Sequence, residues 1–266
     1  MVNKELVILK IGGSVITDKN GELSARTEVI NRVAEEVQKA KLDNLIIIHG
    51  GGSFGHPMAK KYGIKEGLKQ ESQKVGFAET HHVMTVLNGL VMDALICHTV
   101  PAVSITPSSC IVTKKGRIHL FEETILRSLL KMGLVPVLYG DTILDYQLGF
   151  TVISGDQIVS YLARKFGASR IVMGVDVDGI LDSDPKTTKN PKLYSHLTLK
   201  ELESKKNNIR SSNPSDVTGG MLGKINELTS AIEQGIPVSI INANKKNRVY
   251  KALIGTNVEG TYLEKE

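Results

Sequence analysis

Residues 44–56 read NLIIIHGGGSFGH, an apolar run that ends in three consecutive glycines and a serine between two histidines. The run is continuously apolar rather than alternating, as expected for a strand that is buried on both faces. The glycines predict a tight turn directly after that strand. On its residues alone, HGGGSFGH is open to three interpretations: a metal site, a loop that holds an anion, or a turn without a ligand.

Runs of the same kind recur along the chain. Helical patterns separate most of them, and the runs lie at 5–11, 44–50, 101–106, 134–140, 170–175 and 237–243. One helical pattern follows Ser24, a candidate N-cap, and includes Ile30, Val33, Ala34 and Val37. Strands and helices that alternate at this spacing predict right-handed βαβ units and a mainly parallel sheet.

Two stretches depart from this alternation. Residues 111–121 (IVTKKGRIHLF) have a Lys-Gly turn between short alternating runs, and residues 142–154 (TILDYQLGFTVIS) look similar. Each is predicted to be a β-hairpin laid over the sheet edge, where such a flap can cover a ligand. The polar segment 204–216 is expected to be a surface loop beside a site. The expected fold class is α/β, a three-layer α-β-α sandwich with a central, mainly parallel sheet and β-hairpin flaps.

The composition narrows the functional classes. The chain has 266 residues, 41% of them apolar, which suits one large α/β domain or two fused halves and excludes a disordered or fibrous protein. The net charge of +5 is spread over the whole length, which fits an anionic small substrate and not a nucleic-acid surface. Neither a signal peptide nor a membrane-spanning run is apparent, so we expect a cytoplasmic protein. Cys97 and Cys110 are expected to be buried, reduced thiols.

Glycine turns follow several of the predicted strands. They lie in LKIGGSVITDK, HGGGSFGH, YGD (139–141), VDVDGILDSDP (175–185), ISGDQ and TGGMLGK. Ligands of open parallel sheets bind at the carboxyl ends of the strands, where glycine lets backbone N–H groups approach a phosphate closely. A single Gly-Gly pair is more often ordinary turn chemistry. Six such turns together favour a phosphate-binding edge.

Three common motifs do not account for these turns. GGMLGKI (219–225) resembles a P-loop, but its glycine spacing is one residue short and Ile225 stands where Ser or Thr is required. GGGSFG has the Rossmann spacing after a strand, but no acidic residue follows at a matching distance on a second strand end. A zinc site at His49 and His56 lacks a third ligand, because the nearest further histidines belong to a separate predicted helix.

Two lysines flank the glycine turns. Lys10 lies immediately before the first turn, at the end of a buried strand where an unpaired ammonium is costly, and Lys224 follows the last turn. Such lysines need an anion, which can be a substrate phosphate or an internal carboxylate such as Asp156. Phosphoryl transfer requires positioning and positive charge on the moving oxygens, which Lys10, Lys224, backbone amides and a magnesium ion can supply.

With these residues assembled, the chain resembles the amino acid kinase superfamily and, within it, the isopentenyl phosphate kinases. The resemblance runs nearly end to end, through LKIGGSVITDK, HGGGSFGHP, PAVSITPSS, GLVPVLYGD, ISGDQIVSYLA, GVDVDGIL, DVTGGMLGKI and IINANK. It implies an amino-terminal half (1–154) that holds the phosphate acceptor and a carboxyl-terminal half (155–266) that holds ATP, on one continuous sheet. It also implies a homodimer that phosphorylates isopentenyl phosphate to isopentenyl diphosphate with ATP, in an alternative mevalonate route to isoprenoids.

The resemblance also implies which residues act. The catalytic set is Lys10, His56, Asp156 and Lys224, in which the lysines contact the moving γ-phosphoryl group and Asp156 orients them. The residues implied to bind ATP are Lys10, Gly12, Gly13, Lys19, Asp176, Asp178, Gly179, Lys186, Gly220 and Lys224. Those expected to bind the acceptor are Gly51, Gly52, Ser53, His56 and Gly155, with Val83 and Met84 beside its apolar tail. Magnesium is expected to be carried by the nucleotide, because no dedicated carboxylate cage is visible.

His56 distinguishes members of the superfamily. Isopentenyl phosphate kinases have a histidine at the end of SFGH that hydrogen-bonds the acceptor phosphate, whereas the amino acid kinases and uridylate kinases lack this ending. The alternative role for His56 is a cap on the following helix. Two other functions stay open. A phosphonate kinase of the fosfomycin-resistance type shares the glycine loop and histidine. A non-catalytic ligand-binding regulator on this fold would have lost Lys10, Asp156 or Lys224.

Overall fold

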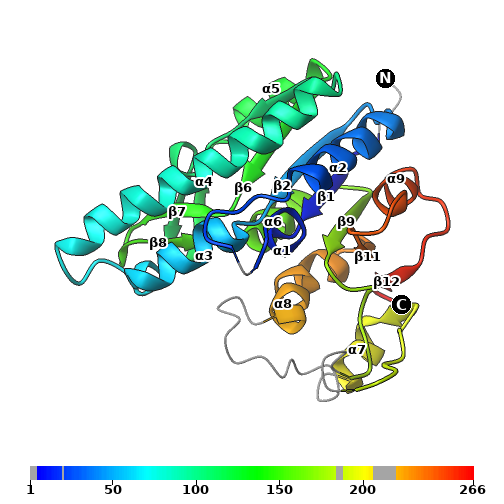
Figure 1. Ribbon diagram of the computed structural model, residues 1–266. Coiled ribbons are helices and arrows are strands. Elements are labelled where there is room, and N and C mark those ends of the chain that lie inside the picture. Colours follow the sequence, from blue (N-terminus) through cyan, green and yellow to red (C-terminus); the bar gives the residue numbers. More distant parts are fainter. Residues whose placement is uncertain (1–4, 20, 184–187, 206–219) are drawn as a thin grey trace.

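A large parallel sheet forms the centre of the protein. The computed structural model describes residues 5–19, 21–183, 188–205 and 220–266. Within them, one sheet has eight strands in the order β10-β12-β11-β9-β1-β2-β6-β3 (Figure 1). Every strand pair in it is parallel except β11 with β12. All six strands predicted from the sequence are present, as β1 (Val7–Ile11), β2 (Leu45–His49), β3 (Ala102–Ser104), β6 (Val135–Tyr139), β9 (Arg170–Val175) and β11 (Val238–Asn242).

Two strands of this sheet were not predicted. They are β10 (His196–Thr198) and β12 (Gly260–Glu264), which lie at one end of the strand order. Strands from the carboxyl-terminal part of the chain, β9 to β12, all lie on one side of β1, and β2, β6 and β3 lie on the other side. The strand order therefore separates the two parts of the sequence across the β9–β1 pair.

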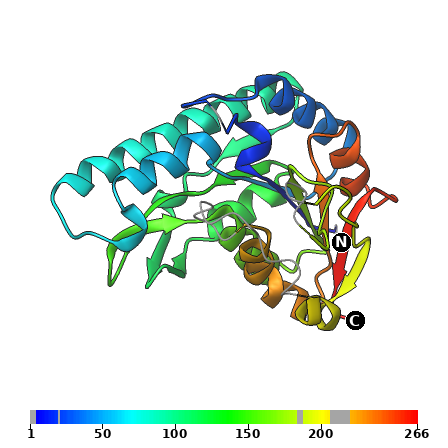
Figure 2. The ribbon, with the colours of Figure 1, turned by 60° about the horizontal axis from the view of Figure 1, so that its bottom comes forward.

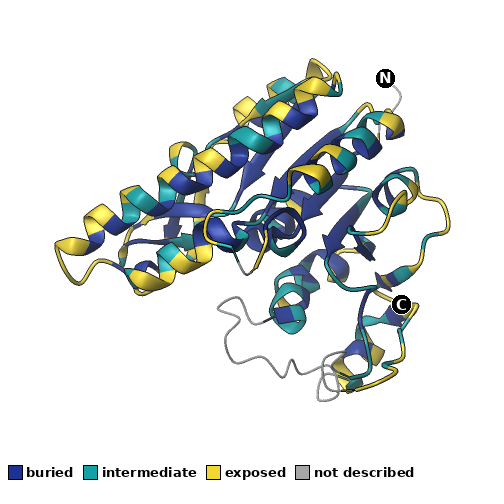
Figure 3. Cartoon of the chain, in the orientation of Figure 1, coloured by how far each residue is buried: buried dark blue, intermediate teal, exposed yellow. Residues whose placement is uncertain are grey.

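Helices cover both faces of the central sheet, which confirms the predicted three-layer sandwich (Figures 1 and 2). One face packs against α1 (Gly13–Ile16), α2 (Thr27–Ala40), α3 (Gly52–Lys61), α4 (Ser72–Cys97) and α9 (Arg248–Leu253). The other face packs against α5 (Thr124–Lys131), α6 (Gly155–Phe166), α7 (Leu199–Lys205) and α8 (Gly220–Glu233). The central strands are buried on both faces and the outer faces of the helices are exposed, as the continuous apolar runs predicted (Figure 3).

The two predicted hairpins are present and form a second sheet of their own. β4 (Ile111–Lys114) pairs antiparallel with β5 (Arg117–Phe121), and β7 (Asp141–Asp145) pairs antiparallel with β8 (Gly149–Ile153). The hairpins join through a parallel contact between Thr113 and Asp145, in the order β5-β4-β7-β8. A short 3-10 helix, η2 (Pro107–Ser109), precedes β4, and another, η1 (Ile64–Glu66), lies between α3 and α4 in the chain.

One carboxylate fastens the turns of both hairpins. The Asp145 side chain accepts hydrogen bonds from the backbone N–H groups of Lys115 (3.2 Å), Gly116 (2.7 Å), Gln147 (2.9 Å) and Leu148 (2.9 Å). It also accepts one from the Thr113 hydroxyl at 2.8 Å. Burial opposes the charged form of Asp145, but these donors outweigh it and lower its pKa. The join between the two hairpins therefore depends on an ionised side chain.

Two local predictions were wrong. Helix α2 begins at Thr27 and its N-cap residue, Arg26, makes no side-chain cap, so Ser24 is not the cap; its carbonyl instead accepts the N–H of Asp18 at 2.9 Å. Cys97 is exposed at the end of α4, because it falls on the outer face of that helix. Cys110 is half-buried, and desolvation raises the pKa of its thiol to about 12, so it stays protonated. Among the described residues, no helix is long and apolar enough to cross a membrane.

Candidate active site

The glycine turns after β1 and β2 touch each other. The two strands are parallel neighbours, so both turns lie at the same edge of the sheet. A Cβ atom on Gly13 would stand 2.1 Å from the backbone nitrogen of Gly52, and one on Gly50 would stand 2.7 Å from that of Gly13. Gly52 also has a φ of +50°, in the left-handed region that favours glycine. Only glycine fits this contact, so the turns serve the close approach of two backbones.

Thr17 holds the two turns together. Its hydroxyl donates to the carbonyl of Gly13 at 2.8 Å and accepts the N–H of Ser53 at 3.0 Å. The Ser53 hydroxyl donates to the carbonyl of Ser24 at 3.5 Å. The backbone N–H and the hydroxyl of Ser53, a residue predicted to bind the acceptor, are therefore both hydrogen-bonded within the protein. Thr17 was not among the predicted site residues. A polar residue shortly after the Gly-Gly pair could nevertheless have indicated a role at the turn.

Two further glycines extend this edge along the sheet. The N–H of Gly140, directly after β6, donates to the carbonyl of His49 at 3.1 Å. A Cβ atom on Gly155, the first residue of α6, would stand 3.1 Å from the Ile48 side chain and 3.3 Å from the same carbonyl. Ser154 caps α6 by accepting the N–H of Gln157 at 3.1 Å. The ends of β1, β2 and β6 and the start of α6 therefore form one glycine-lined edge.

Lys10, Asp156 and Lys224 meet at this edge. The Lys10 ammonium lies 3.0 Å from Oδ1 of Asp156, and the Lys224 ammonium lies 3.6 Å from Oδ2. The side chains of Lys10 and Asp156 are 4% and 8% exposed, whereas that of Lys224 is 20% exposed. The predicted pairing of the two lysines with one carboxylate is thus present, although the three residues come from β1, α6 and α8.

The pKa shifts of this cluster have opposing causes. Burial lowers the pKa of Lys10, and the positive charge of Lys224 adds to that effect, while Asp156 acts against it. Burial alone would raise the pKa of Asp156, but the two lysines outweigh burial and lower it. Oδ1 of Asp156 is buried and accepts no well-directed hydrogen bond from the described residues, so charge is what binds it to Lys10. Two ammonium groups share one carboxylate, which leaves an excess of positive charge.

Six of the residues predicted to bind ATP follow β1 or β9, which are neighbours in the sheet: Gly12, Gly13, Lys19, Asp176, Asp178 and Gly179. The Lys19 ammonium lies 2.6 Å from Oδ2 of Asp176. Burial opposes the charge on Asp176, but Lys19 outweighs it and the pKa is lowered. Asp178 accepts hydrogen bonds from Arg248 (2.6 Å) and Asn242 (3.1 Å). Lys19, Asp176 and Asp178 are therefore already paired within the protein.

Close packing also explains two of the predicted ATP-site glycines. The N–H of Gly12 donates to the carbonyl of Gly174 at 2.8 Å, which ties the end of β1 to β9. Gly179 has a φ of +149°, and a Cβ atom on it would stand 2.5 Å from the hydroxyl of Thr261. Gly220 is the first residue of α8. Lys186 lies outside the described residues, as does most of the polar segment 204–216.

His56 lies inside α3, which begins at Gly52, and is exposed. The alternative that it caps the following helix is therefore wrong. Of the two residues predicted beside the acceptor tail, Met84 packs against the glycine loop: Cβ atoms on Gly51 and Gly55 would stand 2.8 Å and 2.7 Å from its sulfur. Val83 is buried in the core on the α2–α4 side of the sheet.

The β4–β5 hairpin contacts the two helices that carry Asp156 and Lys224. The Gln157 side chain accepts the N–H of Ile118 at 2.9 Å and donates to the carbonyl of Gly116 at 3.1 Å. Arg117 binds Glu227 of α8 with two hydrogen bonds of 2.6 Å and 2.9 Å. These residues were not predicted, because pairs so far apart in the chain leave no local pattern. The flap is thereby anchored beside the lysine cluster.

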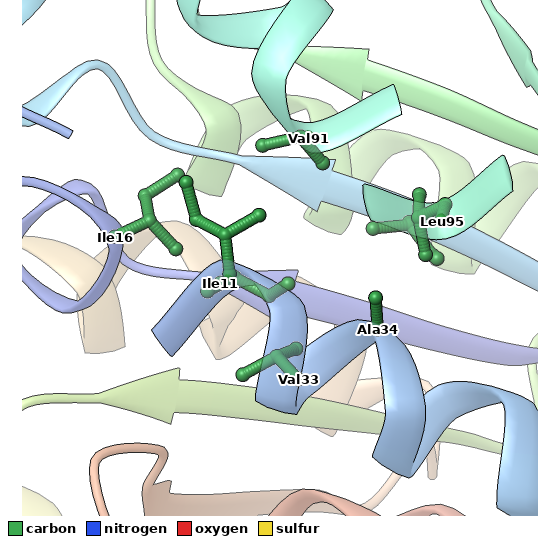
Figure 4. Close-up of a pocket in the computed structure, with 8 residues that line it drawn as sticks. Ile11, Ile16, Val33, Ala34, Val91 and Leu95 are labelled. Atoms are coloured by element: carbon green, nitrogen blue, oxygen red, sulfur yellow. The ribbon is translucent and has the colours of Figure 1, made fainter. Parts of the chain in front are cut away.

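A closed apolar cavity lies on the other side of β1. It has a volume of about 10 Å³ and is lined by eight side chains, among them Ile11, Ile16, Val33, Ala34, Val91 and Leu95 (Figure 4). A space of this size holds one water at most, and it has no polar partner to offer. It is a packing defect of the core and not a ligand site. No group of three or more His, Cys, Asp or Glu residues suited to a metal ion occurs in the described part of the chain.

Comparison with known proteins agrees with this site. The sequence profile of the amino acid kinase family matches residues 5–242. Isopentenyl phosphate kinase of Methanothermobacter thermautotrophicus is 40% identical over 97% of this chain and 98% of its own length. That of Methanocaldococcus jannaschii is also 40% identical, over 97% and 98%. A crystal structure of an isopentenyl phosphate kinase, 37% identical, superposes with a TM-score of 0.85 over 97% of this chain and 99% of that one.

These matches define the class of the protein. The fold and the match over most of its length show that the chain belongs to the amino acid kinase family, whose members named above are phosphotransferases. Within that family it groups with the isopentenyl phosphate kinases, as the sequence motifs predicted. A UMP kinase from Ureaplasma parvum, 22% identical with a TM-score of 0.66, shares the fold.

Proposed function

We propose that this chain transfers the γ-phosphoryl group of ATP to isopentenyl phosphate and forms isopentenyl diphosphate. The observation that carries the proposal is the Lys10–Asp156–Lys224 cluster at the glycine-lined sheet edge. Two cations around one carboxylate favour a further anion, and the transferred phosphoryl group is such an anion. Isopentenyl phosphate kinases that are 40% identical over nearly the whole chain support the choice of acceptor.

The lysines are proposed to bind and stabilise the γ-phosphoryl group. Lys10 is nearly inaccessible and fixed by Asp156, so its charge is positioned before substrate arrives. Such preorganised charge stabilises a transition state more than it stabilises a solvated ground state. Lys224 is more exposed and 3.6 Å from Asp156, so it can shift toward the oxygens as they move from donor to acceptor. Asp156 acts through the lysines, by holding both of them in place.

The two parts of the sheet are proposed to divide the substrates. The strand order places β9 and β11 on one side of β1, where Asp176 and Asp178 follow β9 and are proposed to face the nucleotide. The turn after β2 lies on the other side and is proposed to receive the acceptor phosphate. The division at residues 154 and 155 falls at the N-cap of α6. Magnesium bound to the nucleotide would supply charge on the phosphate oxygens, and Asp156 and Asp176 are engaged with lysines instead.

His56 is proposed to donate a hydrogen bond to the acceptor phosphate. It is exposed on the first turns of α3, whose N-terminus at Gly52 meets the turn after β1. A helix N-terminus favours a negative charge, and an imidazole beside two phosphates gains a proton more readily. The apolar tail of the acceptor is proposed to lie toward Met84, which already packs against Gly51 and Gly55.

A coupled ADP-release assay over several acceptors tests this function. The panel contains isopentenyl phosphate, dimethylallyl phosphate, fosfomycin, UMP and N-acetylglutamate. We expect the highest kcat/KM with isopentenyl phosphate. A preference for fosfomycin would replace the proposed acceptor with a phosphonate, and ADP release that no acceptor stimulates would contradict a kinase of this specificity.

We also propose a homodimer, by resemblance to the family. Light scattering of the purified protein tests it, since a dimer has twice the mass of the 29.0 kDa chain. The monomeric mass at micromolar concentration would refute it. A cytoplasmic location stays a prediction from the sequence.

A further inference from the structure

His49 has no part in the proposed chemistry, yet it is fully buried beside the acceptor turn. It is the last residue of β2 and its ring stacks on Tyr139, with ring centroids 5.4 Å apart. Its Nδ1 atom lies 3.1 Å from the carbonyl oxygen of Gly50, and its Nε2 atom lies 3.2 Å from the side-chain amide of Asn88 on α4. Both ring nitrogens are therefore engaged.

The hydrogen bonds fix the position of the proton on His49. Burial lowers the pKa of His49 to about 4, so the ring is neutral at pH 7 and carries one N–H. A carbonyl oxygen can only accept, so a hydrogen bond from the ring to Gly50 requires the proton to be on Nδ1. Nε2 then has to accept, which requires the NH₂ group of Asn88 to face the ring.

Asn88 meets this requirement if its amide is rotated by 180°, since the structure places its Oδ1 toward Nε2 of His49 and its Nδ2 toward the Ser104 hydroxyl. The oxygen and nitrogen of a side-chain amide are assigned from the hydrogen-bond network, and a rotation by 180° exchanges them. In the rotated form Asn88 donates to Nε2 of His49, and its oxygen faces the Ser104 hydroxyl, the atom that lies 2.6 Å from the amide. Ser104 then donates to Asn88. The Ser104 hydroxyl, one N–H of Asn88 and the Nδ1–H of His49 then each have an acceptor.

This chain of bonds determines the direction of one backbone amide. The C=O and N–H of a trans peptide unit point in opposite directions. The Gly50 carbonyl is turned toward the buried ring, so the N–H of Gly51 points away from the ring. That N–H has no hydrogen-bond partner among the described residues. The neighbouring peptide groups are held by bonds of the Gly50 N–H to Ile11 and of the Gly51 carbonyl to Phe54, and glycine on both sides leaves the ring as the contact that holds the unit between them.

We propose that His49 is a positioning residue: its Nδ1–H holds the Gly50–Gly51 peptide so that the Gly51 N–H is presented to the phosphate of the acceptor. The identity of that acceptor rests on the proposed function, whereas the orientation of the amide and its affinity for a phosphate group do not. His49 thus acts on acceptor binding through the backbone and does not touch the substrate.

Two substitutions of similar size separate this role from simple packing. In His49→Asn, the side-chain amide places a donor near the position of Nδ1, whereas in His49→Gln it reaches the position of Nε2 and leaves Gly50 without a donor. We expect His49→Gln to raise the KM for the acceptor by about tenfold to a hundredfold, the range of a hydrogen bond to a charged group. The KM for ATP should stay within about twofold, and His49→Asn should recover most of the loss. Equal KM values for the acceptor in both variants would overturn the proposal.

NMR of the protein under conditions without turnover tests the Gly51 amide itself. With glycine labelled at both carbonyl carbon and nitrogen, an HNCO experiment reports only glycines that follow a glycine, which are Gly13, Gly51, Gly52 and Gly220. Titration with inorganic phosphate should shift the Gly51 signal in the wild type and in His49→Asn, but not in His49→Gln. This result is expected even if isopentenyl phosphate proves not to be the acceptor. A Gly51 signal that phosphate does not move in the wild type would overturn the proposal.

The tautomer of His49 can be measured without any substitution. A long-range proton–nitrogen correlation spectrum of the wild type distinguishes Nδ1–H from Nε2–H in a neutral ring. We expect Nδ1–H, which is the less common tautomer in solution. A neutral ring protonated on Nε2 could not donate to Gly50, so that spectrum would refute the mechanism even if both variants failed to fold.

Discussion

Replacing Asp156 by Asn removes the carboxylate that Lys10 and Lys224 share while keeping the size of the side chain. At 3.0 Å and an effective dielectric constant of about 20, the attraction between Lys10 and Asp156 is about 5 kcal/mol. Breaking a buried ion pair costs about 3–5 kcal/mol, because the remaining charge stays buried. We therefore expect the free energy of unfolding to fall by about 3 kcal/mol or more.

The same substitution has a second consequence that is opposite in sign. Without Asp156 the two ammonium groups lose the counter-charge that they share, so the negative charge of a triphosphate should stabilise the variant more than the wild type. We expect a non-hydrolysable ATP analogue with magnesium to raise the Tm of Asp156→Asn by more than it raises the wild-type Tm. The kcat should nevertheless fall, because the lysines are no longer held in place.

Urea unfolding and thermal denaturation, each with and without the analogue, measure both effects. The matched control is Glu35→Gln, which breaks the exposed Glu35–Lys39 pair of 2.7 Å on α2. An exposed pair contributes little, so the control should leave both the stability and the response to nucleotide close to those of the wild type. If Asp156→Asn is as stable as the control, or gains less from the analogue than the wild type, the reasoning about this cluster is wrong.

Other substitutions test separate parts of the account. Gly13→Ala places a Cβ atom 2.1 Å from a backbone nitrogen, so it should destabilise the protein by about 1–3 kcal/mol in a urea titration and lower kcat/KM. The control is Gly89→Ala in α4, whose added Cβ atom would have no neighbour within 4 Å, and it should be neutral or stabilising in the same titration. Asp145 has a lowered pKa, so the stability it provides is present above its unfolded-state value of about 3.9 and is lost as the pH falls below that value. Asp145→Asn should therefore lower the urea midpoint at pH 7 and lessen its fall toward pH 3; an unchanged pH dependence would argue against the hairpin clasp. His56→Ala should lower kcat by about a hundredfold or more while Tm and ATP affinity hold, and full turnover would remove His56 from the mechanism. Lys224→Ala should reduce kcat more than it raises KM, because its charge acts on the transition state; a change in KM alone would assign it to binding.

Much of the central sheet could be predicted from the sequence because burial on both faces leaves a local signal. The residues of β1, β2 and β6 are all buried, and each strand is mostly apolar, with Lys10 in β1 and His49 at the end of β2 as polar exceptions. The turns after them could be predicted because the contact between Gly13 and Gly52 excludes any side chain. A requirement that acts on one residue type at one position is visible in a single sequence.

The parts that were missed depend on partners elsewhere in the chain. β12 has only alternating burial and β10 has three residues, so neither forms a long apolar run. The exposure of Cys97 depends on which side of α4 faces solvent at its last turn. Lys10 and Asp156 are 3.0 Å apart in space but belong to β1 and α6, so spacing along the sequence could only suggest the pair. The resemblance to a family, rather than any local pattern, joined these residues into one site.

The central claim is that the cluster of Lys10, Asp156 and Lys224 transfers phosphate to another phosphate. Phosphorus NMR of the wild-type protein with ATP, magnesium and isopentenyl phosphate detects the new bond between the two phosphate groups directly. The account predicts two new coupled signals of an isopentenyl diphosphate that appear in step with ADP. Formation of ADP and free inorganic phosphate, with the isopentenyl phosphate signal unchanged, would contradict it.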